Sequence, residues 1–140
     1  MSDKNTTIKI DVRIMASPKR RNQALELCNE LGLMPDVITW DDRPNGGNPR
    51  YTSQKTWLEP MPKDATHRMV IQDDAILCDD FMEAAYKCIA FKPDGIWTLY
   101  QPLEDKYEGY FRTCVPHIAG VCIVMSREII QDVWNWCDEY

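Results

Sequence analysis

Two pairs of adjacent aspartates stand out in this 140-residue sequence, because each pair directly follows a short apolar run. Asp73 and Asp74 come after residues 68–72 (RMVIQ), whose apolar character predicts a buried strand. Neighbouring carboxylates repel each other and are costly to hold together unless a cation compensates their charge. Mg²⁺ or Mn²⁺ would do so, since these ions take oxygen ligands from one or two carboxylates and from substrate phosphates. The alternative is a polar turn that caps the next helix.

The other pair, Asp41 and Asp42, follows residues 35–40 (PDVITW) and opens a loop rich in Asn, Gly and Pro. One of these carboxylates could accept hydrogen bonds from a nucleotide base or a ribose. The alternative is an ordinary Asp-rich turn ahead of Asn-Gly-Gly.

A basic segment, Ser17-Pro18-Lys19-Arg20-Arg21, follows the first predicted strand. Ser17 is suited to cap a helix that has Pro18 at its first position. Basic side chains together with the free N–H groups of a helix start could hold an anion. The alternative is a solvated basic helix face.

The surrounding elements predict how these three segments are positioned. Strand patterns occur at residues 8–15, 35–40, 68–72 and 95–100, and helical patterns lie between them. This alternation predicts one α/β domain over residues 1–140, with a Rossmann-like, mostly parallel sheet and helices on both faces. Because the carboxyl ends of parallel strands meet at one edge, the three segments should form one surface.

Bulk composition narrows the classes of function. With 22 acidic and 16 basic residues, the net charge of −6 argues against general nucleic-acid binding. No stretch approaches the roughly 20 apolar residues of a membrane span. We therefore expect a cytoplasmic protein with six reduced cysteines. A partner, including a second copy of the chain, could cover the apolar side chains of Trp134 and Trp136 in the last predicted helix.

The order of these motifs resembles the nucleotide-sugar half of GT-A type glycosyltransferases, which belong to the nucleotide-diphospho-sugar transferase superfamily. Ser17 and Pro18 stand where that family has a Ser/Thr-Pro/Arg-type helix start. Residues 71–75 (IQDDA) are similar to its Asp-x-Asp-like motif, although Gln72 occupies a position that is often acidic. The resemblance covers about residues 8–100.

This resemblance implies metal-dependent transfer of a sugar from a nucleoside-diphosphate sugar to an unknown acceptor. Asp41 or Asp42 would contact the base or ribose, and Arg21 would lie near the nucleotide. Asp74 would bind Mn²⁺ or Mg²⁺, while Asp73 would contact the ribose or sugar and adjoin the metal.

Further residues are assigned through the same resemblance. Lys55 could steady the diphosphate, and His117 could be a third metal ligand. If the reaction inverts the anomeric centre, an acceptor hydroxyl needs a general base, for which the candidates are Glu104, Asp105 and Glu108. Plain surface or core roles are the alternatives for Lys55 and His117.

Two other functions stay open at this point. Nucleotidyltransferases have a related sheet and metal, but they usually carry a Gly-rich loop after the first strand, which residues 16–20 (ASPKR) lack. A non-catalytic module that binds a sugar or a protein would use the same fold without the reaction.

Overall fold

The computed structural model describes residues 7–41, 49–99 and 121–139. Its sheet contains β1 (Ile10–Ala16), β2 (Ile38–Trp40), β3 (His67–Gln72), β4 (Trp97–Thr98) and β5 (Cys122–Ser126) in the order β2-β1-β3-β5-β4. Strand β1 is parallel to both β2 and β3, whereas β5 is antiparallel to both β3 and β4. The chain is therefore an α/β structure with a mixed sheet.

The prediction of a mostly parallel sheet needs correction at β5. Among the described strands, two pairings are parallel and two are antiparallel. An apolar run indicates a buried strand but carries no information on its direction. That direction depends on the connection from β4, which passes through residues 100–120 and lies outside the described residues.

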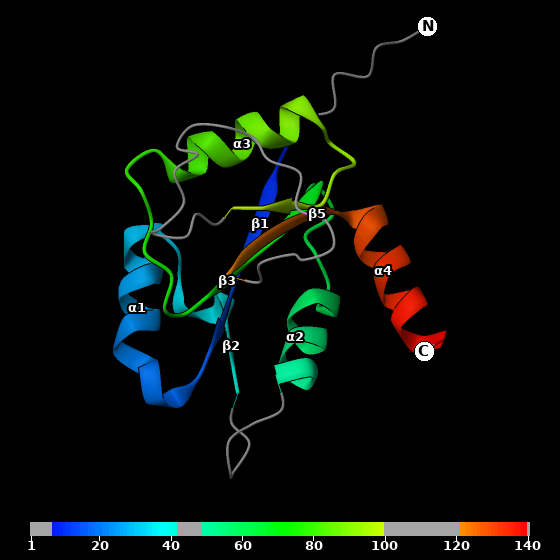
Figure 1. The fold of residues 1–140 in the computed structure, drawn as a ribbon. Helices are drawn as coiled ribbons and strands as arrows, with labels where there is room; N and C mark the ends of the chain where they lie inside the picture. Colours follow the sequence, from blue (N-terminus) through cyan, green and yellow to red (C-terminus); the bar gives the residue numbers. More distant parts are fainter. Residues whose placement is uncertain (1–6, 42–48, 100–120, 140) are drawn as a thin grey trace, which may run out of the picture.

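Helices cover both faces of the sheet, as predicted. Helices α1 (Arg21–Glu30) and α3 (Phe81–Phe91) pack on one face, while α2 (Pro49–Leu58) and α4 (Arg127–Glu139) pack on the other (Figure 1). Short 3₁₀ helices, η1 (Pro18–Arg20) and η2 (Pro35–Val37), precede α1 and β2. Within the described ranges, no helix is long and apolar enough to cross a bilayer.

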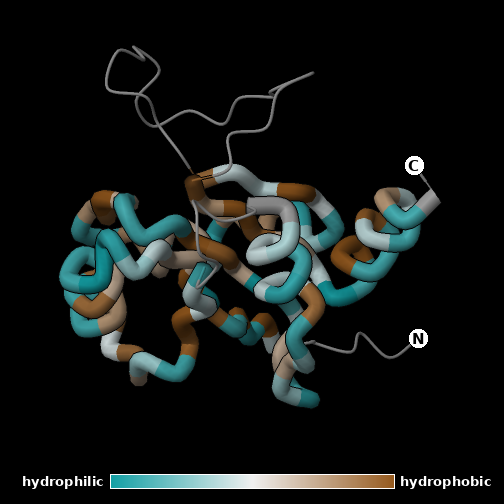
Figure 2. The backbone as a smooth tube through the Cα atoms, turned by 90° about the horizontal axis from the view of Figure 1, so that it is seen from below, coloured by the Kyte–Doolittle hydropathy of each residue, from teal (hydrophilic) through white to brown (hydrophobic). Residues whose placement is uncertain are grey.

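The larger core lies beneath α1 and α3. Side chains of β1 alternate between buried and half-buried, because successive residues of a strand point to opposite faces. Hydrophobic segments run through the middle of the molecule, whereas hydrophilic residues alternate with them along the helices (Figure 2). The most deeply buried members of this core come from both strands and helices: Ile14, Ala24, Met69, Ile71, Ala85 and Ile89.

The opposite face has a smaller apolar core and a buried charge. Trp57 of α2 and Ile130 of α4 pack there against the sheet. Arg68 of β3 is fully buried, and its guanidinium donates to the Asp11 carboxylate at 2.6 and 2.9 Å. It also donates to the backbone carbonyls of Thr56 at 3.2 Å and Trp57 at 3.0 Å. These carbonyls belong to the last turn of α2, where backbone C=O groups have no N–H partner within the helix. Arg68 therefore ties the end of α2 to β3.

The predicted Ser-Pro start of the first helix is found as the 3₁₀ turn η1, and Gly32 marks the end of α1. Ser17 caps η1, and its hydroxyl accepts a hydrogen bond from the Lys19 N–H at 3.3 Å. Gly32 has φ of 69°, and the next residue, Leu33, donates its N–H to the Cys28 carbonyl at 2.9 Å. A left-handed glycine with this bonding is a common way to end a helix.

Candidate functional site

The carboxyl ends of β1, β2 and β3 meet at one edge of the sheet. Ala16 of β1 is in register with Trp40 of β2, and Met15 is in register with Gln72 of β3. The next residue along each strand is Ser17, Asp41 or Asp73. The structure thus brings together the starts of the three polar segments that the sequence singled out.

Asp73 is the most constrained residue at this edge. Its side chain is 1% exposed, and its Oδ2 accepts a hydrogen bond from the Ser17 N–H at 2.8 Å. Its Oδ1 accepts from Arg20 Nε, also at 2.8 Å. The Asp73 N–H donates to the Met15 carbonyl at 3.0 Å. Asp73 therefore fastens the turn after β1 to the end of β3.

Arg20, rather than Arg21, is the basic residue at Asp73. The 3₁₀ helix η1 places residues three apart above one another, and the Arg20 N–H bonds the Ser17 carbonyl at 2.9 Å. Arg20 consequently lies over Ser17, where Asp73 also binds. The Arg21 guanidinium instead lies over the Trp40 ring, 5.7 Å from its centroid. Sequence reasoning missed Arg20, although the Ser-Pro start was a signal for this tight turn.

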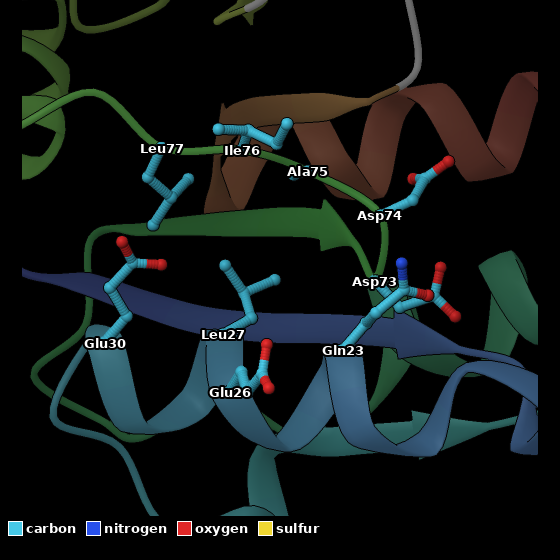
Figure 3. Close-up of a pocket in the computed structure, with 9 residues that line it drawn as sticks. All are labelled: Gln23, Glu26, Leu27, Glu30, Asp73, Asp74, Ala75, Ile76 and Leu77. Carbon is cyan, nitrogen blue, oxygen red and sulfur yellow. The ribbon is translucent and has the colours of Figure 1, made fainter.

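Asp74 is exposed and borders a cleft of about 270 Å³ between α1 and the segment that follows β3. The carboxylates of Asp73 and Asp74 point in different directions (Figure 3). Residues of α1 and of the segment after β3 line this cleft: Gln23, Glu26, Leu27, Glu30, Asp73, Asp74, Ala75, Ile76 and Leu77. Neither Arg21 nor Asp41 is among them, so this cleft does not join the three polar segments in one pocket. Its carboxylates make it a poor place for a phosphate without a cation.

Asp41 has an unsatisfied acceptor. Its Oδ1 is buried and has no hydrogen-bond partner among residues 7–41, 49–99 and 121–139, while its backbone N–H bonds the Ala16 carbonyl at 2.8 Å. Buried polar atoms are nearly always hydrogen-bonded, and an unpaired one costs free energy. An exception at the carboxyl end of a parallel strand is therefore informative about ligand binding.

The other predicted site residues lie elsewhere. Lys55 is exposed on α2, which covers the face opposite α1, and it does not line the cleft. Pro18 occupies the first position of η1, where it shapes the turn that presents Arg20. Five predicted residues fall outside the described part of the chain: Asp42, Glu104, Asp105, Glu108 and His117.

The fit of a divalent metal differs between the two aspartates. Asp73 already has both oxygens hydrogen-bonded, and Arg20 supplies the cation that sequence reasoning attributed to a metal. Asp74 is exposed, and its carboxylate makes no hydrogen bond within the described ranges. No group of three or more His, Cys, Asp or Glu side chains there is arranged to hold a metal. The Asp74 carboxylate is therefore accessible to a ligand, whereas both oxygens of Asp73 are already engaged by Ser17 and Arg20.

No family model matches the chain, and searches of curated proteins and of solved structures likewise find no match. Conclusions about function rest on the geometry of this edge.

Proposed function

We propose that the carboxyl edge of β1, β2 and β3 binds a nucleoside-diphosphate sugar, and that the protein transfers the sugar to an acceptor as a GT-A type glycosyltransferase with a Rossmann-like nucleotide fold. The observation that carries this proposal is the buried, unpaired Oδ1 of Asp41 beside the end of β1. An acceptor at this place, on the same edge as Arg20 and Asp74, suits a ligand with both hydroxyl and phosphate groups.

The nucleoside would bind at the end of β2. A ribose hydroxyl or a base N–H that donates to Asp41 Oδ1 would satisfy that atom on binding. The Arg21 guanidinium lies over the Trp40 ring, and both groups are planar and of the kind on which bases stack. Sequence reasoning assigned Asp41 and Arg21 to the nucleotide, and their positions at one edge support that assignment.

The diphosphate would bind at the turn after β1. Lys19, Arg20 and Arg21 are exposed there, and the Arg20 guanidinium uses only its Nε–H to bond Asp73. Its remaining N–H groups can bind phosphate oxygens, for which the guanidinium fork is well suited. Mn²⁺ or Mg²⁺ held by Asp74 would supply charge stabilisation for the leaving diphosphate. The chain's own contribution is to orient the phosphates between the basic turn and Asp74.

A calorimetric panel of nucleoside diphosphates and their sugars, each with and without Mn²⁺, tests this proposal. We expect one nucleotide series to bind, with higher affinity when Mn²⁺ is present. Release of the free nucleoside diphosphate from the donor would then separate a transferase from a non-catalytic binder. If no nucleotide in the panel binds under either condition, the proposed donor site is wrong.

A further inference from the structure

The Arg20–Asp73 ion pair places a positive charge where a divalent cation would otherwise be attracted. The two side chains are 2.8 Å apart, and Asp73 is almost completely shielded from solvent. We propose that Arg20 is an internal counter-ion that keeps the Asp73–Asp74 pair from binding divalent cations tightly while the nucleotide is absent. The inference deepens the proposed donor site and rests on it for its biological meaning.

Electrostatics is the first reason. The Arg20 guanidinium contacts the buried Asp73 carboxylate and offsets its charge, although water reaches the half-exposed arginine and weakens the interaction. A cation that approaches Asp73 is therefore also repelled by the positive charge of Arg20. Asp74 remains as the single uncompensated carboxylate of the pair, and one exposed carboxylate holds Mg²⁺ or Mn²⁺ weakly because these ions keep most of their water.

The exposure of Arg20 is the second reason. Its side chain is 49% exposed, whereas that of Asp73 is 1% exposed, so the arginine can rearrange without disturbing the core. Asp73 would still keep its hydrogen bond from the Ser17 N–H. A diphosphate offers Arg20 an alternative anionic partner. Binding of the diphosphate and of the cation should therefore favour each other, since either one relieves the competition at Asp73.

Binding of Mn²⁺ alone, followed by the electron paramagnetic resonance of the free ion, tests the counter-ion role without nucleotide. Arg20→Gln should bind Mn²⁺ about tenfold more tightly than the unchanged protein, because the charge of Asp73 becomes available. Lys19→Gln is the matched control, since it removes the same charge from the neighbouring exposed residue and should change the affinity by less than about twofold. Equal affinities for Arg20→Gln and Lys19→Gln would overturn the proposal.

Arg20→Gln could fail to fold because it leaves the buried charge of Asp73 without its ion-pair partner. A double variant keeps the test decisive in that case. Arg20→Gln combined with Asp73→Asn replaces the ion pair by a neutral pair and leaves the net charge unchanged. If Asp73 is neutralised in the native protein, this double variant should bind Mn²⁺ within about twofold of the unchanged protein. A tenfold loss would show that Asp73 is itself a metal ligand, which contradicts the proposal.

The two proposals can fail separately. If Mn²⁺ affinity follows the expected pattern but no nucleotide binds, the counter-ion role stands and the donor site is wrong. If nucleotides bind but Arg20→Gln leaves Mn²⁺ affinity unchanged, the counter-ion role alone is wrong.

Discussion

Replacement of Asp41 by Ala should weaken nucleotide binding without weakening the fold. The buried Oδ1 of Asp41 makes no hydrogen bond to the described part of the chain, so its removal sacrifices none there. The free energy of unfolding should stay the same or rise by up to about 1 kcal/mol, because a desolvated acceptor is eliminated. In the complex, the lost hydrogen bond to a charged acceptor is worth about 1.5–3 kcal/mol, which corresponds to an affinity about 10-fold to 150-fold lower.

Calorimetric titration of the nucleotide and urea unfolding together measure both effects. Asp36→Ala provides the matched control, because Asp36 is exposed on η2 and its removal changes the net charge by the same amount as the removal of Asp41. The control should bind nucleotide like the unchanged protein. Equal affinity for both variants would refute the assignment of Asp41. A loss of several kcal/mol in the unfolding of Asp41→Ala would show instead that this carboxylate stabilises the fold.

Three further predictions follow from charge and burial. Asp74→Asn should abolish the Mn²⁺ dependence of nucleotide binding in calorimetry while leaving stability equal or higher; unchanged Mn²⁺ dependence would exclude Asp74 as a ligand. Arg68→Ala should lower the urea-derived free energy of unfolding by about 3–5 kcal/mol, because it leaves the Asp11 carboxylate and the helix carbonyls without Arg68. Arg13→Ala, which removes the other arginine that contacts Asp11, should lower it by less. Burial raises the pKa of Cys122 from 9.0 to about 12, so the folded thiol stays neutral while the unfolded one ionises. Stability should therefore fall by about 1.4 kcal/mol per pH unit from pH 9 towards 12, and Cys122→Ala should show a shallower fall in urea titrations under reducing conditions.

Much of the fold could be predicted because the chain alternates clearly between two periodicities. Strand β1 buries every second residue, and the alternation of apolar and polar side chains that produces this burial is visible in the sequence itself. Gly32 ends α1 for a local reason, since few other residues accept its positive φ. The direction of β5 could not be predicted, because pairing direction depends on how the chain returns to the sheet rather than on side-chain pattern.

The site was predictable at the level of strand ends but not of individual contacts. Parallel strands bring Ser17, Asp41 and Asp73 to one edge whatever their side chains do. The choice between Arg20 and Arg21 depends on a single 3₁₀ turn, in which neighbouring residues point in directions about 120° apart. The ion pair at Asp73 gives one of the two adjacent aspartates after β3 a counter-charge from the chain itself, which the sequence pattern alone did not reveal.

The burial of Arg68 has a consequence for how the molecule opens. Any motion that separates the end of α2 from β3 must leave a fully desolvated guanidinium without its carbonyl partners. Such an opening is costly, so the end of α2 and the strand should unfold in one cooperative step rather than by fraying of the helix. In native-state hydrogen exchange, amides of the last turn of α2 should therefore exchange with the opening free energy of β3.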